Sequence, residues 1–321
     1  MHTCRGVVDC LSHNGTEVTR AAFIVNPTKS DDLDSLREAV TAAMTKAGWE
    51  RPLWLETTEE DPGRGQAEDA IKQGVDVVLV CGGDGTITAC ASALANSGVP
   101  LAIVPAGTGN LLARNLELPL DRDAALELAL TGSDRALDVG TIDGEPFVVM
   151  AGMGLDAVML SDASETLKAK IGWAAYVLAA ARHLRDRPVE VELTGDDAAP
   201  IHRRIHGLVV GNVGRLQGGV PLLPDAHPDD GLLDVVVLTP LGPAGWLRLA
   251  AAVLLRRKNS PEFDRLRVRR LKVRAARAMP CERDGEVCDS RRDARLEIMP
   301  GALIVRCVPA GSATNGNRKS P

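Results

Sequence analysis

Aromatic residues are scarce in this chain of 321 residues, which has three Phe, one Tyr and four Trp. Proteins that bind single-stranded nucleic acid stack the bases on aromatic side chains, and proteins that bind duplexes offer the phosphates a basic surface. The net charge of this chain is −6 at pH 7. The scarcity of aromatic residues and the negative net charge both argue against nucleic acid as a partner.

Long hydrophobic runs are also missing. The longest uncharged apolar stretch, around residues 171–181, falls short of the roughly 20 residues that a helix needs to cross a bilayer. Residues 1–20 contain His, Asn, Asp and Glu in place of the apolar core of a signal peptide. We therefore expect a cytoplasmic protein that meets any membrane from its surface.

Paired cysteines and a Walker A sequence are absent as well. The seven cysteines are scattered, which fits a reducing cytoplasm better than a disulfide framework. Cys281 and Cys288 lack the short spacing of a zinc knuckle, so we infer no metal site from them. No Gly-Lys-Ser/Thr follows a glycine at the P-loop spacing, which excludes a P-loop enzyme.

A strand, a glycine turn and a helix follow one another in residues 75–94. Residues 75–80 form a β-branched and aliphatic run, typical of a buried parallel strand. The run ends in Gly82, Gly83, Asp84 and Gly85, and residues 86–94 then have the pattern of a helix. Bare backbone N–H groups and a helix N-terminus at such a turn can bind a phosphate. A tight turn without a ligand is the alternative interpretation.

Strands and helices alternate through the first part of the chain. Apolar strands are predicted at residues 22–25, 53–55, 75–80 and 101–104, and helices at 33–47, 67–71, 86–94, from about 110, and at 121–130. This alternation predicts a parallel sheet covered by helices on both faces. A second glycine turn, residues 105–110, follows the last of these strands, at the sheet edge where such folds bind ligands.

The pattern changes near residue 138. Short strands are predicted at residues 136–140, 146–151, 189–194, 207–212, 233–238, 267–275 and 294–298, with helices at 165–185 and 243–257. We therefore expect an α/β nucleotide-binding domain over residues 21–137 and an antiparallel β-rich domain over 138–300. Residues 1–20 and 311–321 are expected to be flexible ends.

Four segments together resemble the diacylglycerol kinase family, with its ceramide and sphingosine kinase relatives. They are Asn26-Pro27, Gly82-Gly83-Asp84-Gly85-Thr86, the second glycine turn at 105–110, and Asp284-Gly285-Glu286. Residues 211–212, 218–219 and 230–234 match the region between them, so the resemblance spans residues 22–308. NAD kinases and phosphofructokinases have similar first loops, and only the full order of motifs is specific. The resemblance implies the same two domains, with residues 301–308 returning to the first.

The resemblance also implies ATP as the cofactor. Phosphoryl transfer requires positioning and neutralisation of the phosphates. The residues expected to contact the nucleotide are Asn26, Thr57, Thr58, Gly82, Gly83, Asp84, Gly85, Thr86, Gly107 and Thr108. The alternative for Thr108 and Asn110 is an ordinary helix N-cap. Residues 59–65 look inserted relative to some relatives, so which of the two neighbouring threonines acts is left open.

Three carboxylates are candidate catalytic groups. Asp84 could hold Mg²⁺ or take the proton of the acceptor hydroxyl, and the resemblance makes Asp284 the rival base. Glu286 would point to the same face as Asp284 in an extended segment. A hairpin turn is the alternative meaning of Asp284-Gly285.

A second Mg²⁺ site is implied by the resemblance alone. Asp230 matches an acid that binds a structural Mg²⁺ in bacterial relatives, with main-chain oxygens from the positions of His227 and Leu232. Oxygen ligands suit this cation. An aspartate in a turn before Gly231 is the plain alternative.

Two apolar segments could face lipid. Trp246, Leu247, Leu249, Val253 and Leu254 lie beside the basic residues Arg248, Arg256, Arg257 and Lys258, as in a helix lying on an anionic bilayer. Leu167, Ile171, Ala174, Val177 and Leu178 form another apolar face that could border an acyl cleft. For both, core packing is the favoured alternative.

The sequence therefore predicts an ATP- and Mg²⁺-dependent lipid kinase at the inner face of the membrane, with diacylglycerol as acceptor and phosphatidic acid as product. The rivals are a soluble kinase of the NAD kinase type and a non-catalytic nucleotide- or lipid-binding regulator. Residues 105–110 and 284–286 argue against the NAD kinase type, as does the lack of a downstream Asn-Glu pair. The oligomeric state is open, with a homodimer among the alternatives.

Overall fold

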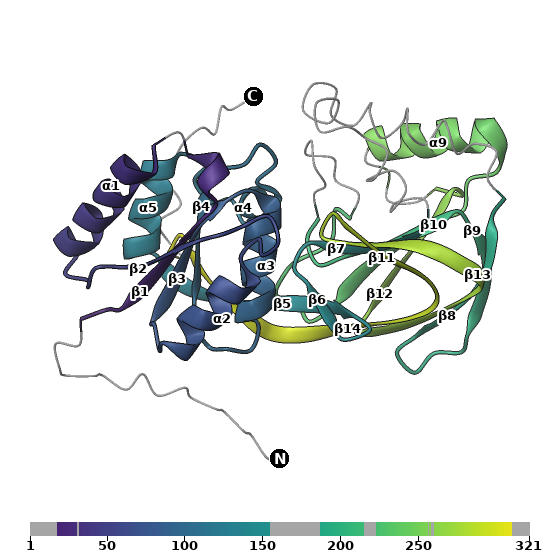
Figure 1. Ribbon diagram of the computed structural model, residues 1–321. Helices are drawn as coiled ribbons and strands as arrows, with labels where there is room; N and C mark the ends of the chain where they lie inside the picture. The colour runs from purple at the N-terminus through teal and green to yellow at the C-terminus, as the bar shows by residue number, and fades with distance from the viewer. Residues whose placement is uncertain are drawn as a thin grey trace, which may run out of the picture.

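The computed structural model describes residues 18–30, 32–154, 187–214, 223–255, 257 and 260–309. These residues form two units side by side, joined by a narrow ribbon (Figure 1). The helix predicted over residues 165–185, with its apolar face, lies outside the described residues. So do residues 218–219 and most of the two chain ends.

The N-terminal unit is a parallel sheet with helices on both faces, as the alternation predicts. Its sheet order is β4-β3-β1-β2, and every pairing in it is parallel. The elements are β1 (Ala21–Val25), the 3₁₀ turn η1 (Pro27–Lys29), α1 (Leu33–Lys46), β2 (Leu53–Glu56), α2 (Arg64–Lys72), β3 (Val77–Gly82), α3 (Asp84–Leu94), β4 (Leu101–Pro105), α4 (Leu111–Asn115) and α5 (Arg122–Thr131). Helix α3 begins at Asp84, two residues earlier than predicted, so Gly85 lies in its first turn.

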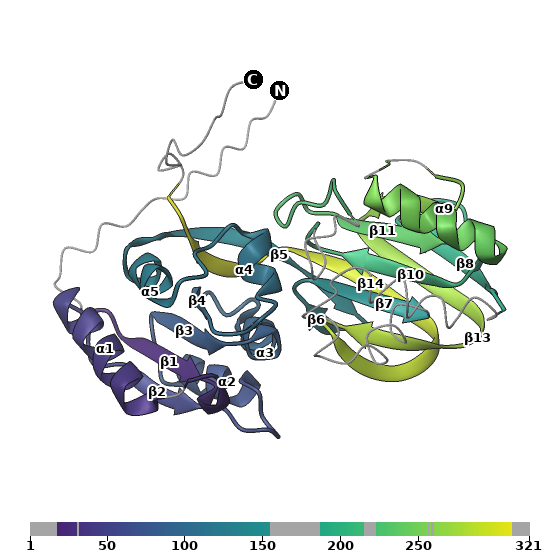
Figure 2. The ribbon, with the colours of Figure 1, turned by 90° about the horizontal axis from the view of Figure 1, so that it is seen from above.

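Both faces of this sheet are buried, because β1, β3 and β4 contain only buried residues. One face packs against α1 and α5, which supply Leu36, Val40, Met44, Ala125 and Ala129. The opposite face packs against α2, α3 and α4. Figure 2 shows the two helical layers on either side of the sheet.

The C-terminal unit is built of antiparallel strands. They are β6 (Glu145–Phe147), β7 (Met150–Gly154), β8 (Val189–Gly195), β9 (Ile201–Ile205), β10 (Gly207–Gly211), β11 (Leu233–Leu238), β12 (Phe263–Val268), β13 (Arg270–Arg283) and part of β14 (Glu286–Cys307). Their shared core includes Phe147, Met153, Leu193, Leu208 and Leu271. In the described part of this unit, the helix α9 (Gly242–Leu254) covers the outer face of β11 and β12 (Figure 1). The predicted fold class is confirmed.

Two strand predictions in this unit were wrong in detail, and one strand was missed. Residues 146–151 form two strands, because the N–H groups of Val148 and Val149 bind a side chain. Residues 267–275 are divided at Arg269, whose N–H donates to Asp196 at 2.9 Å. Strand β9 was missed, since its central residues are polar and exposed, and among the described strands it pairs with β8 alone.

Strands β5 (Ser133–Ile142) and β14 form the ribbon between the two units. Strand β14 pairs with β13 at one end, and at the other its Val305 pairs in parallel with Leu101 of β4. The register between β5 and β14 shifts at Gly301, which has φ +63°. The buried Asp138 carboxylate accepts the Gly301 N–H at 2.8 Å and the Gly231 N–H at 2.6 Å. The domain limits inferred from the sequence stay predictions.

Within the described residues, no helix is both long enough and apolar enough to cross a bilayer.

Candidate active site

The two glycine turns touch each other at the carboxyl ends of β3 and β4. A Cβ on Gly107 would lie 2.7 Å from the Gly83 Cα, so this approach requires glycine. The Ala106 N–H donates to the Gly82 carbonyl at 2.9 Å and holds the turns in register. The turns therefore form one continuous backbone surface beside the N-terminus of α3, where N–H groups lack partners within the helix.

Asp84 links the first turn to α4, the helix that follows the second turn. One of its carboxylate oxygens accepts the N–H of Leu111, the first residue of α4. The side chain is partly exposed. Asn26 lies on the other side of the first turn, and its amide donates to the Thr86 hydroxyl at 3.4 Å. The structure thus brings three of the predicted nucleotide residues, Asn26, Asp84 and Thr86, to one end of the sheet.

Asn110 shapes the second turn from within. It occupies the N-cap position of α4 at φ +48°, and its side chain makes no capping hydrogen bond. Its amide group instead accepts from the Gly107 N–H at 3.0 Å and donates to the Gly107 carbonyl at 2.9 Å. Thr108 is exposed and is not the N-cap.

The two adjacent threonines have different surroundings. Thr57 is buried, and its N–H donates to the Val25 carbonyl at 2.9 Å, which places it beside the end of β1. The Thr58 hydroxyl accepts the Asp61 N–H at 3.1 Å and closes its own loop. The Asp61 carboxylate in turn accepts the N–H of Gly65 at the start of α2. The inserted-looking segment is therefore a helix-capping loop.

Lys29 is a candidate that the sequence reading missed. It is exposed at the end of η1, and a Cβ built on Gly83 would lie 3.9 Å from its Cε. A cation at this point can reach a phosphate group held by the first turn. The signal was available, since Lys29 follows the Asn26-Pro27 motif by two residues.

Asp284 occupies a two-residue hairpin turn between β13 and β14. Asp284 and Gly285 have φ values of +49° and +90°, so the hairpin alternative describes the backbone correctly. The side chain has a further role, because its carboxylate accepts the N–H groups of Val148, Val149 and Met150 at 2.8, 2.8 and 3.0 Å. Desolvation raises the pKa of Asp284 to about 6, and these hydrogen bonds oppose that rise.

Asp284 and Glu286 line a cavity of about 500 Å³ between the units. Thr88 and Ser92 of α3 and Arg64 of α2 form the opposite wall. The remaining lining residues are Glu60, Asp61, Pro62, Gly65, Glu68, Ala89, Pro146 and Arg283. The hairpin acids thus face α3, the helix that begins at Asp84. Sequence reasoning missed Arg64, Thr88, Ser92 and Arg283, since no local pattern marks them.

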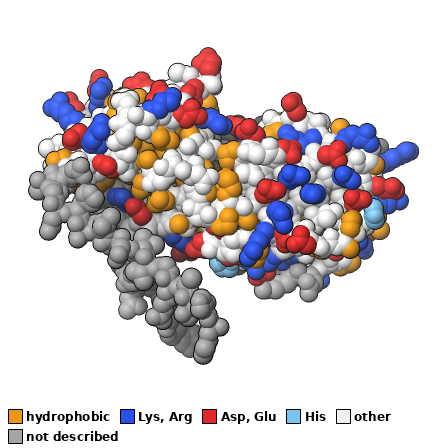
Figure 3. Space-filling view, turned by 90° about the horizontal axis from the view of Figure 1, so that it is seen from below, with side chains coloured by type: hydrophobic (Ala, Val, Ile, Leu, Met, Phe, Trp, Pro, Cys, Tyr) orange, Lys and Arg blue, Asp and Glu red, His pale blue; other side chains and the backbone are white. Residues whose placement is uncertain are grey.

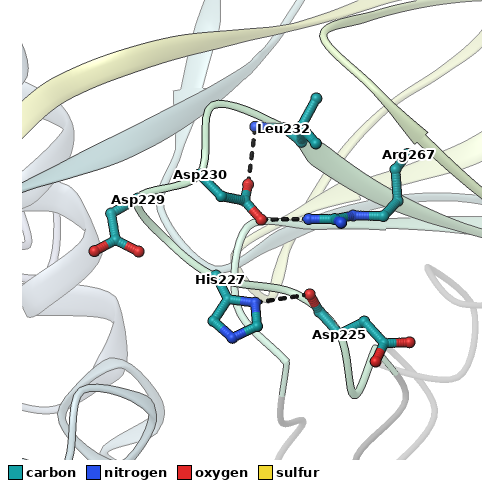
Figure 4. Close-up of a pocket in the computed structure, with 6 residues that line it drawn as sticks. All are labelled: Asp225, His227, Asp229, Asp230, Leu232 and Arg267. Atoms are coloured by element: carbon teal, nitrogen blue, oxygen red, sulfur yellow. Dashed lines mark hydrogen bonds and ion pairs between the residues drawn. The ribbon is translucent and has the colours of Figure 1, made fainter.

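A second cavity, of about 640 Å³, surrounds the predicted structural Mg²⁺ site. Figure 4 shows the Asp230 carboxylate between the Leu232 N–H, at 3.0 Å, and the Arg267 guanidinium. Figure 4 also shows the His227 ring, whose Nδ1 lies 2.9 Å from the Asp225 carbonyl. The described part of the chain has no cluster of three or more His, Cys, Asp or Glu that could hold a metal.

Both Asp230 oxygens have a partner, and the positive charge beside them comes from Arg267. In this arrangement the guanidinium takes the place of a divalent cation. Mg²⁺ held by His227, Asp230 and Leu232 stays a prediction, and it requires Arg267 to leave the Asp230 carboxylate.

Known families match both units. The diacylglycerol kinase catalytic domain matches residues 20–142, and the YegS C-terminal NAD kinase beta sandwich-like domain matches residues 148–307. A "Probable lipid kinase YegS-like" of Pseudomonas aeruginosa is 37% identical over 283 residues, which are 85% of this chain and 90% of that protein. A diacylglycerol kinase of Bacillus subtilis is 29% identical over 83% of this chain and 89% of its own length.

Two solved structures share the fold. A diacylglycerol kinase from Bacillus anthracis has a TM-score of 0.71 at 21% identity, covering 92% of this chain and 99% of its own. An NAD kinase from Archaeoglobus fulgidus, in complex with ATP, has a TM-score of 0.51 at 14% identity, covering 90% of this chain and 93% of its own. At 37% identity over most of both chains, the Pseudomonas relative decides the family. The chain belongs to the YegS-like lipid kinases, a family of enzymes with the diacylglycerol kinase catalytic domain.

Proposed function

We propose that this lipid kinase transfers the γ-phosphate of ATP to the free hydroxyl of diacylglycerol and forms phosphatidic acid. The observation that carries the proposal is the Asp284 carboxylate. It faces the cavity across from α3 and is held by three backbone N–H groups. A fixed carboxylate at that point can take the proton of an alcohol.

The nucleotide end of the reaction is assigned to the two glycine turns. The N–H groups of Gly83, Gly85 and Thr86 at the N-terminus of α3 supply donors for phosphate oxygens. Lys29 adds a cation beside Gly83. Gly82 serves a different purpose, because a Cβ there would lie 2.7 Å from the Thr86 Cβ. Its role is to let the helix turn back over the strand.

Asp84 is the residue that we assign to Mg²⁺ at the nucleotide. Its carboxylate is partly exposed beside the turns, and a hard cation prefers such an oxygen ligand. When bound with ATP, Mg²⁺ neutralises charge on the phosphates. The Leu111 N–H fixes one Asp84 oxygen and leaves the other for the cation.

Asp284 is the base that we propose in place of Asp84. The acceptor oxygen forms a bond to the γ-phosphorus as the bond from that phosphorus to ADP breaks, and the hydroxyl proton passes to the Asp284 carboxylate. A pKa of about 6 keeps that carboxylate ionised at neutral pH while leaving it more basic than an ordinary aspartate. Glu286 lies beside it in the cavity lining. The reaction takes place at the surface of the membrane that contains the lipid.

The test is transfer of labelled γ-phosphate to a lipid panel in mixed micelles, with products identified by mass spectrometry. NAD serves as a soluble acceptor in the same panel. We expect phosphatidic acid from diacylglycerol, and strong losses in Asp84→Ala and Asp284→Asn. The matched control is Asp289→Asn, an exposed carboxylate of the same strand as Glu286.

Three results would contradict the proposal. Labelled product from another lipid would reassign the acceptor, and turnover of NAD alone would favour a soluble substrate. Full activity in Asp284→Asn would remove the base from this hairpin.

A further inference from the structure

The helix α9 has two apolar faces, and only one of them is part of the core. Trp246, Leu249 and Ala252 are buried against Val236 and Phe263 of the underlying strands. The core-packed interpretation of this helix is therefore correct for its inner face. It does not account for the other face.

The outer face forms an apolar stripe that is exposed to solvent. The outer stripe consists of Ala244, Leu247 and Ala251 of α9 with Leu241 and Leu255, which flank the two ends of the helix, all exposed. Leu241, Leu247 and Leu255 are 75%, 71% and 62% exposed, the three highest values among the exposed large apolar residues in the described ranges. From Ala244 onward the spacing of three, four and four residues places these side chains along one side of a helix.

The charged residues of the segment that contains the outer stripe all have one sign. Residues 239–261 contain no Asp or Glu, whereas they contain four Lys or Arg in a chain whose net charge is −6. Arg248 and Arg257 are exposed. Arg248 pairs at 2.6 Å with Glu262, whose side chain is buried. On the underside of the C-terminal unit, by contrast, acidic and basic side chains are mixed (Figure 3).

We propose that the outer stripe of α9 docks the enzyme on the surface of an anionic lipid bilayer. An exposed apolar row with basic residues and no acids is the pattern of a helix that lies in the interface plane. The helix lies on the outside of the described strands of its unit (Figure 2). This inference rests on the lipid acceptor of the proposed function, because it supplies the contact that brings the enzyme to that lipid.

The experiment is sedimentation of the full chain with vesicles, without ATP. One set contains equal parts of phosphatidylcholine and phosphatidylglycerol, and the other contains phosphatidylcholine alone. The test variant is Leu247→Ser with Leu255→Ser, and the matched control is Leu120→Ser, an exposed leucine of the N-terminal unit. Both are checked for unchanged thermal unfolding.

We expect the chain to bind the anionic vesicles, and the double variant to bind them more weakly by about a hundredfold or more, in line with the loss of two leucines from a buried interface. Arg257→Glu should weaken binding further at low salt, while Leu120→Ser should not change it. Equal binding by the double variant would overturn the proposal. A dimer in solution that the same substitutions abolish, without vesicle binding, would show instead that the stripe covers a second copy.

The docking result and the proposed function can fail separately. Vesicle binding requires no turnover, so it tests the outer stripe even if diacylglycerol is not the acceptor. Conversely, phosphorylation of a short-chain diacylglycerol dissolved below its micelle concentration should be the same in the double variant and in the unchanged chain. Loss of that activity would mean that the substitutions damage the site.

Discussion

Gly82 and Gly85 lie in the same turn but require glycine for different reasons, and substitution by alanine should separate them. A Cβ on Gly82 would lie 2.7 Å from the Thr86 Cβ and 2.8 Å from its Cγ2. A Cβ on Gly85 meets no atom within 4 Å. If phosphate binds at the N-terminus of α3, the open space at Gly85 is space for the ligand.

Gly82→Ala should destabilise the protein. The clash involves a branched side chain in a buried turn, and overpacking of this kind costs about 1–3 kcal/mol. Gly85→Ala should leave the free energy of unfolding unchanged or raise it, because alanine in a helix is favoured over glycine by roughly 0.5–1 kcal/mol. Its KM for ATP should nevertheless rise about tenfold or more, equivalent to about 1.4 kcal/mol of lost binding.

Thermal unfolding and steady-state kinetics with varied ATP measure the two effects on the same samples. In Gly85→Ala the affinity for ATP should fall while stability is unchanged or rises. In Gly82→Ala stability and the affinity for ATP should both fall. A KM for ATP within twofold of the unchanged chain in Gly85→Ala would refute the placement of the phosphates over this turn.

Three further predictions concern charged groups. Asp284→Asn should lower kcat by about 10²–10⁴-fold. In the unchanged chain, kcat/KM should decrease when the pH is lowered past about 6, because the raised pKa of Asp284 leaves its carboxyl group protonated there. A pH profile without that decrease would contradict the role of Asp284 as base. Lys29→Ala should raise the KM for ATP with little effect on the KM for lipid, whereas Lys29→Arg should retain most of the affinity; equal nucleotide kinetics in all three chains would exclude a phosphate contact. Arg267→Met should free Asp230, so that Mg²⁺ raises the melting temperature of this variant. The unchanged chain, assayed without nucleotide, should melt at the same temperature with Mg²⁺ or with a chelator. A Mg²⁺-induced rise in the unchanged chain would show that the cation displaces the guanidinium.

The N-terminal unit was predictable because its signals are local. Runs of apolar residues at 22–25 and 101–104 are long enough and apolar enough to indicate buried strands, and glycines end them. The structure places the corresponding strands within one residue of those limits. The C-terminal unit was harder to divide, since Val148 and Val149 look like strand residues but donate to Asp284.

The sequence by itself indicated the family, the fold class and the positions of the glycine turns, because each motif and each strand or helix pattern is local and only their order along the chain has to be added. Tertiary structure alone decided which groups the acids contact. The Asp284 carboxylate and the Val148 N–H are 136 residues apart, and only the pairing of β13 with β7 brings them to 2.8 Å. The same holds for Asp230, whose partner Arg267 comes from a neighbouring strand region. A carboxylate beside a glycine has the same local sequence whether it closes a hairpin, pairs with arginine or takes a proton, and its surroundings depend on how the sheet is assembled.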